Sequence, residues 1–299
     1  MSIKTKLAGA FRSGLTLISP KLNTKVTYFV KFHKRLDLSN PVRFDEKLQW
    51  LKFNTYWNNP LVKQCADKFK VRDYIEKCGL NSILNELIAV YETPEQIEWD
   101  KLPKSFALKL NVGCGFNHII ADKSKEDFVS IKKETERWIR QSKTQYLAYS
   151  EMQYKDVKPY ILVEKYLGNA EKGTLPTDYK VYCFNGEPEF VMTCVGRENG
   201  GHPKFYFFDK NWKLARISRD SKKAPEGFTL PKPEGFDDLM MSAKKLSEPF
   251  PFVRADFYIC GGRVVFGELT FTPSGGMDTD RLPDTDKLFY NMLKLPDRD

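Results

Sequence analysis

Two carboxylates and a guanidinium lie close together near the C-terminal end of the sequence. Arg254 and Asp256 alternate with apolar residues over positions 253–259, which is the pattern of a strand with one polar face. Glu268 follows after the pair Gly261-Gly262. Such a set is poor material for a core but suits Mg²⁺ and phosphate. We therefore predict a cation and phosphate site on a β-hairpin.

The turn of this hairpin decides whether the two acids share a face. A two-residue Gly261-Gly262 turn pairs Asp256 with Gly267 and sends Glu268 to the opposite face. A three-residue turn that includes Arg263 pairs Asp256 with Glu268, with Cβ atoms about 5 Å apart. The metal-site hypothesis predicts the three-residue turn or an equivalent bulge. The alternative is a solvent-facing hairpin edge.

A glycine-bearing loop lies between two predicted strands, over 106–110 and 118–120. Gly113 and Gly115 let backbone N–H groups turn toward an anion, and Lys109 just before them adds positive charge. These features fit a loop that closes over phosphates. Because Gly-x-Gly also occurs in many plain turns, a purely structural role stays open.

Two further candidates are ambiguous when taken alone. Lys68 shares one face of a predicted helix with Arg72, at i,i+4 spacing. Glu164 and Lys165 end an apolar run that is typical of a buried strand. The backbone there can bind the edge of an adenine, and Glu164 can accept its amino hydrogens. The ordinary alternatives are a solvated basic helix face and a solvated strand end.

Helical and strand patterns are mixed along the chain. Asn185-Gly186 between two strand-like runs is a strong hairpin signal. The sequence predicts helices over 44–51, 67–78, 124–148 and 237–247, strands over 106–110, 118–120, 160–167, 178–184 and 189–194, and a loop over 219–236. Strands joined as hairpins favour an α+β fold over a doubly wound parallel sheet.

Composition excludes several classes of protein. A chain of 299 residues with 41% hydrophobic residues indicates one large globular domain or two intimate ones. No run approaches the ~18 apolar residues of a membrane-spanning helix. Six cysteines without a Cys-x-x-Cys pair predict reduced thiols. Three widely separated histidines argue against a zinc site.

The net charge of +9 is concentrated in residues 1–36, which hold eight Lys or Arg and no acid. The remaining residues hold 40 basic and 39 acidic side chains and are nearly neutral. This basic arm is predicted to be partly helical and amphipathic. It suits an anionic membrane surface, a polyanionic saccharide or nucleic acid, or simply confers solubility.

The order of these features resembles the ATP-grasp superfamily, and most of all its TupA-like branch, named for teichuronopeptide biosynthesis. The resemblance covers roughly residues 35–290. The phrases that carry it are Phe44-Asp45-Glu46-Lys47-Leu48-Gln49-Trp50, Ala66-Asp67-Lys68, Leu102-Pro103, Glu164-Lys165-Tyr166-Leu167, Asp178-Tyr179-Lys180, Arg254-Ala255-Asp256 and Gly267-Glu268-Leu269-Thr270.

The resemblance implies an ATP-grasp fold, in which two α+β subdomains clasp ATP. Residues 1–60 are then a basic, mostly helical N-terminal extension, and residues 61–299 form the ATP-grasp domain. We expect its N-terminal subdomain, with the glycine loop, over 61–165. We expect its C-terminal subdomain, with the metal site, over 166–299.

The resemblance also implies a role for each candidate site residue. The residues implied for ATP binding are Lys68, Lys109, Gly113, Gly115, Glu164, Lys165 and Leu167. Lys68 and Lys109 are implied to contact its phosphates. Those implied for Mg²⁺ are Asp256, Glu268 and Thr270. The expected catalytic residues are Arg254, Lys180 and Arg197, of which Arg254 steadies the transferred phosphoryl group.

Three departures from the family pattern bear on these roles. Amine ligases of the superfamily usually carry Asn where this chain has Thr270. Relatives often show an Asn-His-Gly-Ser-Gly-like loop, whereas this chain has Asn-Val-Gly-Cys-Gly over 111–115. Some 60 basic, helix-like residues stand in place of a substrate-binding α/β domain. We therefore expect the acceptor near Lys180, Arg197 and Arg281, or with help from the basic arm.

The function expected on these grounds is an ATP- and Mg²⁺-dependent carboxylate–amine ligase acting through an acyl-phosphate. Its expected partners are an amino acid or other amine and a uronic acid on an anionic saccharide, a lipid-linked intermediate or a nucleotide sugar. Surface (capsular or cell-wall) polysaccharide biosynthesis is the expected setting. The location is then cytoplasmic, with residues 1–36 available for peripheral contact with the membrane or an assembly complex.

Three other functions stay open at this stage. A phosphotransferase acting on a sugar hydroxyl keeps the ATP site but yields a phosphate ester instead of an amide. A glycosyltransferase of the same pathway binds nucleotide sugars. Nucleic-acid binding is disfavoured, because the body of the chain is nearly neutral and carries no recognised nucleic-acid motif.

Overall fold

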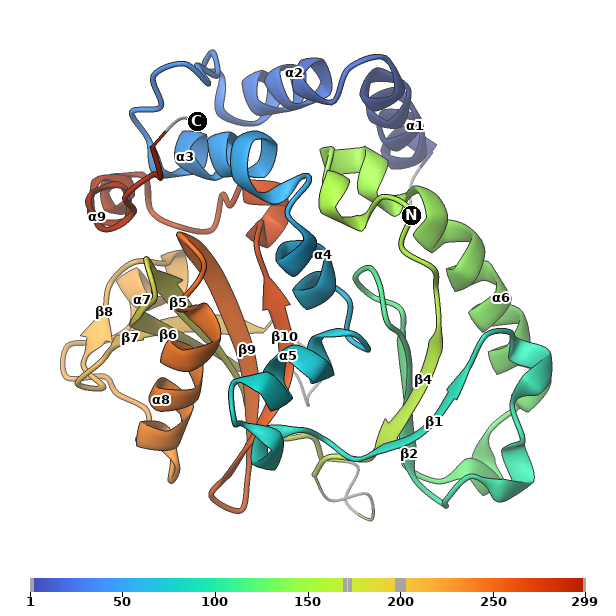
Figure 1. Ribbon diagram of the computed structural model, residues 1–299. Coiled ribbons are helices and arrows are strands. Elements are labelled where there is room, and N and C mark those ends of the chain that lie inside the picture. Colours follow the sequence, from blue (N-terminus) through green and yellow to red (C-terminus); the bar gives the residue numbers. More distant parts are fainter. Residues whose placement is uncertain (1–2, 169–170, 172–173, 197–202, 298–299) are drawn as a thin grey trace. The chain divides into compact units, whose positions relative to one another are not determined.

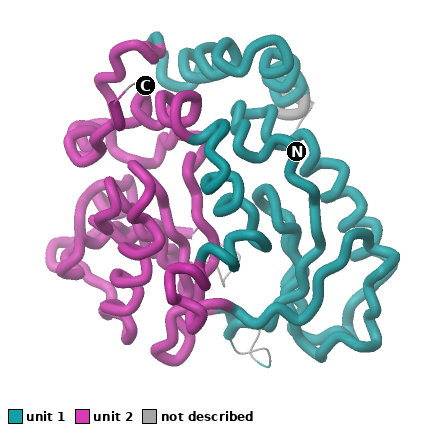
Figure 2. The backbone as a smooth tube through the Cα atoms, viewed as in Figure 1, with its two compact units in different colours: residues 1–35, 56–74, 85–175 teal, residues 36–55, 75–84, 176–299 magenta. Residues whose placement is uncertain are grey.

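The computed structural model describes residues 3–168, 171, 174–196 and 203–297 (Figure 1). The chain forms two compact units (Figure 2). Unit 1 comprises residues 1–35, 56–74 and 85–175, and unit 2 comprises residues 36–55, 75–84 and 176–299. The domain boundaries expected from the sequence at residues 60 and 165 stay a prediction.

Unit 1 contains a four-stranded antiparallel sheet with the order β1-β4-β2-β3. Its strands are β1 (Leu87–Tyr91), β2 (Phe106–Leu110), β3 (Asn117–Ile120) and β4 (Ile161–Lys165). Buried and half-buried residues alternate along β2, as its sequence pattern predicts. The strands predicted over 106–110, 118–120 and 160–167 are therefore confirmed.

Helix α6 (Phe128–Gln145) packs on this sheet. It begins where the Asp127 carboxylate accepts a hydrogen bond from the Val129 N–H. Its apolar face places Ile131 and Trp138 in a core that includes Phe106, Leu108, Leu110, Phe116, Ile161 and Val163. The helix predicted over 124–148 is confirmed, although the observed helix is shorter than predicted at both ends.

Unit 1 also contains three other helices and the first part of a fourth, α5, among the described residues. They are α1 (Ile3–Ile18), α2 (Pro20–Phe32), α4 (Pro60–Ala66) and α5 (Val71–Lys77). The helix predicted from Asp67 starts too early, because Asp67 accepts hydrogen bonds from the N–H groups of Phe69 and Lys70 and closes a turn there. Lys68 lies in that turn, so it does not share a helix face with Arg72.

Unit 2 is built on a six-stranded antiparallel sheet with the order β10-β9-β5-β6-β7-β8. Its strands are β5 (Asp178–Phe184), β6 (Glu187–Val195), β7 (Lys204–Asp209), β8 (Leu214–Ala215), β9 (Phe252–Cys260) and β10 (Arg263–Thr270). Asn185 and Gly186 both have positive φ and form the predicted two-residue turn between β5 and β6. The sheet is antiparallel throughout, as expected for an α+β fold.

Four helices complete unit 2, namely α3 (Phe44–Leu51), α7 (Arg219–Lys223), α8 (Phe236–Ser247) and α9 (Asp286–Met292). Helices α3 and α8 were predicted. The loop prediction over 219–236 misses α7, whose first turn is capped by the Ser218 hydroxyl accepting from the Ser221 N–H. Phe44, Phe184, Phe252 and Phe289 have ring centroids 5.2–5.8 Å apart and centre the core.

Two chain-wide features accompany this fold. All six cysteines are free, in agreement with the predicted reduced thiols. Among the described residues, every helix is too short or too polar to traverse a bilayer.

Candidate active site

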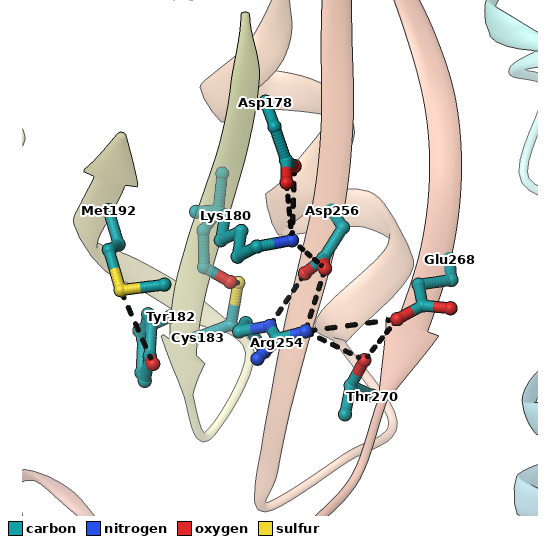
Figure 3. Close-up of polar contacts among 10 residues, drawn as sticks. Asp178, Lys180, Tyr182, Cys183, Met192, Arg254, Asp256, Glu268 and Thr270 are labelled. Atoms are coloured by element: carbon teal, nitrogen blue, oxygen red, sulfur yellow. Dashed lines mark hydrogen bonds and ion pairs between the residues drawn. The ribbon is translucent and has the colours of Figure 1, made fainter. Parts of the chain in front are cut away.

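The charged residues of the β9–β10 hairpin share one face with charged residues of the neighbouring strand β5 (Figure 3). Lys180 on β5 pairs in register with Asp256 on β9, and Asp256 pairs with Glu268 on β10. In the next row, Tyr182, Arg254 and Thr270 occupy the same three strands. Period-two alternation along each strand therefore brings the predicted metal residues together with Arg254 and Lys180, two of the three predicted catalytic residues.

A β-bulge, not a longer turn, puts Asp256 and Glu268 on one face. Arg263 pairs with Cys260, so the turn contains only Gly261 and Gly262, both with positive φ. The three-residue turn was therefore the wrong alternative. The register then shifts between Phe266 and Glu268 and leaves Gly267 without a partner. The equivalent bulge that the metal-site hypothesis allowed is confirmed.

Asp256 is held by two cations. Its carboxylate accepts from Arg254 Nε and Nη2, both at 2.7 Å, and from Lys180 Nζ at 2.6 Å. Lys180 Nζ also lies 2.8 Å from Asp178 Oδ2. Asp256 is only 4% exposed, so these contacts replace the water that a free carboxylate would need. The charged side chains of the cluster thus hold one another in place.

Burial and neighbouring charges act in opposite directions on the cations of this cluster. Burial alone lowers the pKa of Lys180, but the charges of Asp256 and Asp178 outweigh it and raise the pKa above its ordinary value. Burial likewise opposes the charge of Arg254, and Asp256 again shifts its pKa upward. Both cations therefore stay charged across the physiological range and are suited to neutralising phosphate oxygens.

Glu268 is the most open carboxylate of the cluster. Its side chain is 36% exposed, and Oε1 accepts from Thr270 Oγ1 at 3.2 Å and lies 3.8 Å from Arg254 Nη2. Arg254 Nη2 donates to Thr270 Oγ1 at 3.2 Å. One guanidinium thus contacts all three residues expected at the metal, as the dashed lines in Figure 3 show.

The donor atoms of this cluster fit Mg²⁺. Asp256, Glu268 and Thr270 offer oxygen atoms only, which is the ligand type that Mg²⁺ prefers. No group of three His, Cys, Asp or Glu among the described residues forms a metal cage. Mg²⁺ usually takes one or two carboxylates and completes its shell with waters and substrate phosphates. Two opposed carboxylates therefore match this ion.

In unit 1, Lys68 and Lys109 each contact a different part of the expected nucleotide site. Lys68 Nζ donates to the Gly113 carbonyl at 3.0 Å, so it lies against the glycine loop. Lys109 Nζ, on β2, forms a 2.8 Å ion pair with Glu164 on β4. Glu164 is 7% exposed and also accepts from Asn85 Nδ2. Its carboxylate is thus held by protein groups.

The glycine loop is held by a residue that the sequence did not single out. Gln145, the last residue of α6, accepts from the Cys114 N–H at 3.1 Å and donates to the Cys114 carbonyl at 3.0 Å. Gly113 and Gly115 both have positive φ, and a Cβ at Gly113 would lie 2.3 Å from Gln145 Oε1. Glycine at 113 is favoured by this positive φ, and a Cβ there would also lie 2.7 Å from the Phe116 ring and would displace the Gln145 amide.

Asn85 also supports the strand end that was expected at the adenine. Its Nδ2 donates to the Lys165 carbonyl at 2.9 Å, and the Lys165 N–H donates to the Glu86 carbonyl at 3.0 Å. Leu167 follows two residues later. This backbone is therefore well anchored on one side, and its role toward adenine stays a proposal.

The structure bears differently on Arg197 and Arg281, two cations that were expected near the acceptor. Arg197 lies outside the described residues. Arg281 is 7% exposed, pairs with Asp45 at 2.5 Å, and lies over the rings of Phe44 and Phe289. The expectation that Arg281 helps to bind the acceptor was wrong, because its guanidinium is used inside the core of unit 2.

The sequence places this chain in one family. The family model described as "TupA-like ATPgrasp" matches residues 46–294, and the chain therefore belongs to this family. This membership agrees with the α+β fold that was expected for the chain. No curated protein shows significant sequence similarity to the chain.

Solved structures of ligases are similar at low identity. D-alanine–D-alanine ligase from Bacillus anthracis complexed with ATP has 13% identity and a TM-score of 0.48, over 77% of this chain and 65% of that one. The Helicobacter pylori enzyme has 16% identity and a TM-score of 0.46, over 84% and 69%. L-amino acid ligase from Bacillus licheniformis has 10% identity and a TM-score of 0.42, over 75% and 47%. The chain spans less than two thirds of the length of the first and third of these proteins.

Proposed function

We propose that this protein joins an amine to a carboxylate at the expense of ATP, through an acyl-phosphate. The observation that carries the proposal is the aligned row of Lys180, Asp256 and Glu268 on β5, β9 and β10. One cation fixes one carboxylate, and a second, more open carboxylate lies opposite. This arrangement suits a metal–phosphate group whose charge must be neutralised during transfer.

The proposed reaction has two balanced steps. A substrate carboxylate oxygen attacks the γ-phosphorus of ATP, the bond to the β–γ bridging oxygen breaks, and ADP leaves. The amine nitrogen then attacks the acyl carbon, the C–O bond to phosphate breaks, and inorganic phosphate leaves while the nitrogen loses a proton. The products are an amide, ADP and phosphate.

The residues of unit 2 have separate roles in these steps. Asp256 and Glu268 are proposed to hold Mg²⁺, which supplies charge neutralisation at the phosphate oxygens. Arg254 is proposed to steady the transferred phosphoryl group, and Lys180 to support it from β5. Thr270, in place of the usual Asn, offers a hydroxyl that already contacts Arg254 and Glu268. Arg197 is kept as a candidate for the acceptor.

The residues of unit 1 are proposed to bind the nucleotide. Lys68 and Lys109 contact the phosphates, and the loop with Gly113 and Gly115 covers them. Binding of ATP then requires Lys109 to exchange part of its ion pair with Glu164 for a phosphate oxygen. Lys165 and Leu167 contact adenine mainly through their backbone.

The proposed acceptor is a uronic acid carboxylate in surface polysaccharide biosynthesis, and the proposed amine is an amino acid. The family resemblance supports this choice of substrate class. A uronic acid on a polymer, a lipid-linked intermediate or a nucleotide sugar presents the same carboxylate. The proposed location is cytoplasmic, where ATP is available.

The first experiment measures phosphate release from ATP across a panel of uronic acids and amino acids, with mass spectrometry of the products. We expect release that depends on both a carboxylate and an amine, and an amide product. A phosphate ester on a sugar hydroxyl would identify a phosphotransferase instead. Thermal stabilisation by nucleotide sugars but not by ATP with Mg²⁺ would favour a glycosyltransferase.

A second experiment tests the metal assignment without risk to the fold. Glu268→Ala removes a partly exposed carboxylate, and we expect it to lower turnover at least ~100-fold and to abolish stabilisation by Mg²⁺–ATP. Glu187→Ala on β6 is the matched control, because Glu187 is an exposed carboxylate paired with Lys244 outside the cluster. Full activity of Glu268→Ala would exclude this carboxylate from the metal site.

A further inference from the structure

Helices α1 and α2 of unit 1 direct polar side chains toward the protein. Thr16 on α1 donates to the Leu147 carbonyl at 2.7 Å and lies 2.8 Å from Ser150 Oγ. Asn23 on α2 donates to Ser150 Oγ at 3.0 Å and to Thr16 Oγ1 at 2.8 Å. All four of the polar residues Thr16, Asn23, Thr24 and Thr27 are buried. The inward face of this helix pair is thus largely polar, with Tyr28 of α2 as a buried aromatic residue among these groups.

The outward face of α1 is apolar instead. Phe11 is 61% exposed, Leu17 is 74% exposed and Ile18 is 77% exposed. Leu7 precedes Phe11 by four residues and Ile18 by eleven, so these three side chains lie on one helix face. A surface helix of a globular protein normally shows the reverse, with its apolar stripe inward. A contiguous exposed apolar face of this kind marks an interaction surface.

Helix α2 carries positive charge on its exposed side. Lys21 and Lys25 are exposed on α2, beside the exposed side chains of Leu22 and Phe29. Residues 1–36 contain eight Lys or Arg and no acid. The exposed sides of α1 and α2 therefore offer both apolar area and cations, which is the composition of helices that lie in the interface of an anionic bilayer.

The charge also argues against a second copy of the chain as the occupant. A two-fold contact would place the same cationic surface on both partners, and like charges across an interface repel. An anionic lipid surface instead complements the lysines and accepts the apolar side chains. It needs no residue of opposite charge within the arm.

We propose that the α1–α2 hairpin, residues 3–32, docks on the surface of a bilayer that contains anionic lipids. Leu7, Phe11, Leu17 and Ile18 enter the boundary between headgroups and acyl chains, and Lys21 and Lys25 contact lipid phosphates. The polar contacts of Thr16 and Asn23 fasten the hairpin to the rest of unit 1. This attachment goes beyond the proposed ligase activity and does not depend on it.

Vesicle flotation with the full chain tests the proposal directly. We expect the protein to float with vesicles of phosphatidylcholine and phosphatidylglycerol at 3:1 and to float weakly with phosphatidylcholine alone. Raising the salt from 0.05 M to 0.5 M should release most of the bound protein, because the lipid charge is screened. ATP is omitted, so a failure of the ligase hypothesis does not affect the result.

Three variants separate the apolar and the cationic contributions. Phe11→Ser/Leu17→Ser/Ile18→Ser should weaken binding at least about tenfold, because three exposed side chains lose their apolar contact. Lys21→Gln/Lys25→Gln should weaken it about fivefold per cation. Val129→Ser is the control, because Val129 is 63% exposed on α6, away from the hairpin. Unchanged thermal melts establish that each variant is folded.

Two outcomes would overturn the proposal. The first is no flotation of the wild-type protein with anionic vesicles at low salt. The second is flotation that the Phe11, Leu17 and Ile18 substitutions leave unchanged. Sedimentation equilibrium without lipid then tests whether a second copy of the chain covers this surface. Dimerisation of the wild-type chain but not of the triple variant would show that it does.

Discussion

Asp256 and Glu268 face each other across β9 and β10 because Gly267, which directly precedes Glu268 on β10, has no partner in the register. A regular hairpin with the same two-residue turn would place Glu268 on the other face of the sheet. The bulge therefore converts an ordinary turn into a carboxylate pair. Bulges are frequent next to active sites, where they re-aim a side chain.

Gly267→Ala should disturb this pair with little effect elsewhere. An added Cβ would lie 3.0 Å from the Asp256 carbonyl oxygen, so the two strands must separate slightly. We expect the free energy of unfolding to fall by about 1 kcal/mol and the Mg²⁺ concentration for half-maximal activity to rise. Gly14→Ala is the control, because a Cβ there meets nothing within 4 Å. Equal effects of the two substitutions would contradict the importance of the bulge.

Alternation in the sequence was enough to predict the face on which Arg254 and Asp256 lie, because period two is a local property of strands. Alternation also left two possibilities for Glu268, namely the face of the hairpin that carries Asp256 and the opposite face. It did not reveal where a residue leaves the ladder, since a bulge depends on the contacts of both strands. Asp178, two residues before Lys180, could have been found by the same alternation.

Long-range side-chain contacts were beyond this reasoning. Gln145 and Cys114 are 31 residues apart, and nothing near Gln145 marks it as a partner of the glycine loop. Arg281 was expected near the acceptor because it is a cation in the C-terminal half of the chain. Its partner Asp45 is 236 residues away, and only the packing of α3 against α9 brings the two together.

The buried ion pairs of Lys180 predict a large loss of stability on removal of its charge. Lys180→Met leaves Asp178 and Asp256 without this partner, and we expect the free energy of unfolding to fall by about 3 kcal/mol. Adding Asp178→Asn should restore part of that stability, because it removes one of the two carboxylate charges that Lys180 neutralises in the wild type. Urea unfolding of both variants measures the difference.

An exposed ion pair of the same unit provides the comparison for Lys180. Lys244 contacts Glu187, and both side chains are more than half exposed. Lys244→Met should therefore change the free energy of unfolding by less than about 1 kcal/mol. If Lys180→Met has an equally small effect, the β5–β9 cluster does not depend on buried charge pairing.

The pKa of the Asp45 carboxyl group determines how Asp45 contributes to the pH dependence of the stability of unit 2. Burial raises its pKa from 3.8 to about 6, despite the opposing charge of Arg281. Between these values the folded protein binds more protons than the unfolded chain, so Asp45 makes stability fall as pH rises from about 4 to about 6. Asp45→Asn cannot titrate. The stability of wild type minus that of the variant should therefore decline by roughly 2 kcal/mol across this window.

Urea unfolding of wild type and Asp45→Asn at several pH values from 4 to 7 measures that difference. The comparison cancels the titration of other groups, which both proteins share. A difference that stays constant, or that grows as pH rises, would show that Asp45 is at least as easily ionised in the folded protein as in the unfolded chain.

Gln145 predicts an effect on ATP binding rather than on folding. Its amide satisfies both the N–H and the carbonyl of Cys114, so Gln145→Ala should leave the glycine loop to be ordered by the nucleotide. We expect KM for ATP to rise about threefold to tenfold, with kcat and the melting temperature nearly unchanged. Gln145→Glu should raise KM further, because a carboxylate repels both the Cys114 carbonyl and the phosphates.

Gln141→Ala is the matched control for Gln145, since Gln141 is an exposed residue one turn earlier on α6. It should leave KM for ATP unchanged. A rise in kcat with Gln145→Ala would mean that opening of the loop limits turnover and that Gln145 slows it. An unchanged KM in both Gln145 variants would mean that ATP binds without using the loop conformation that this side chain holds.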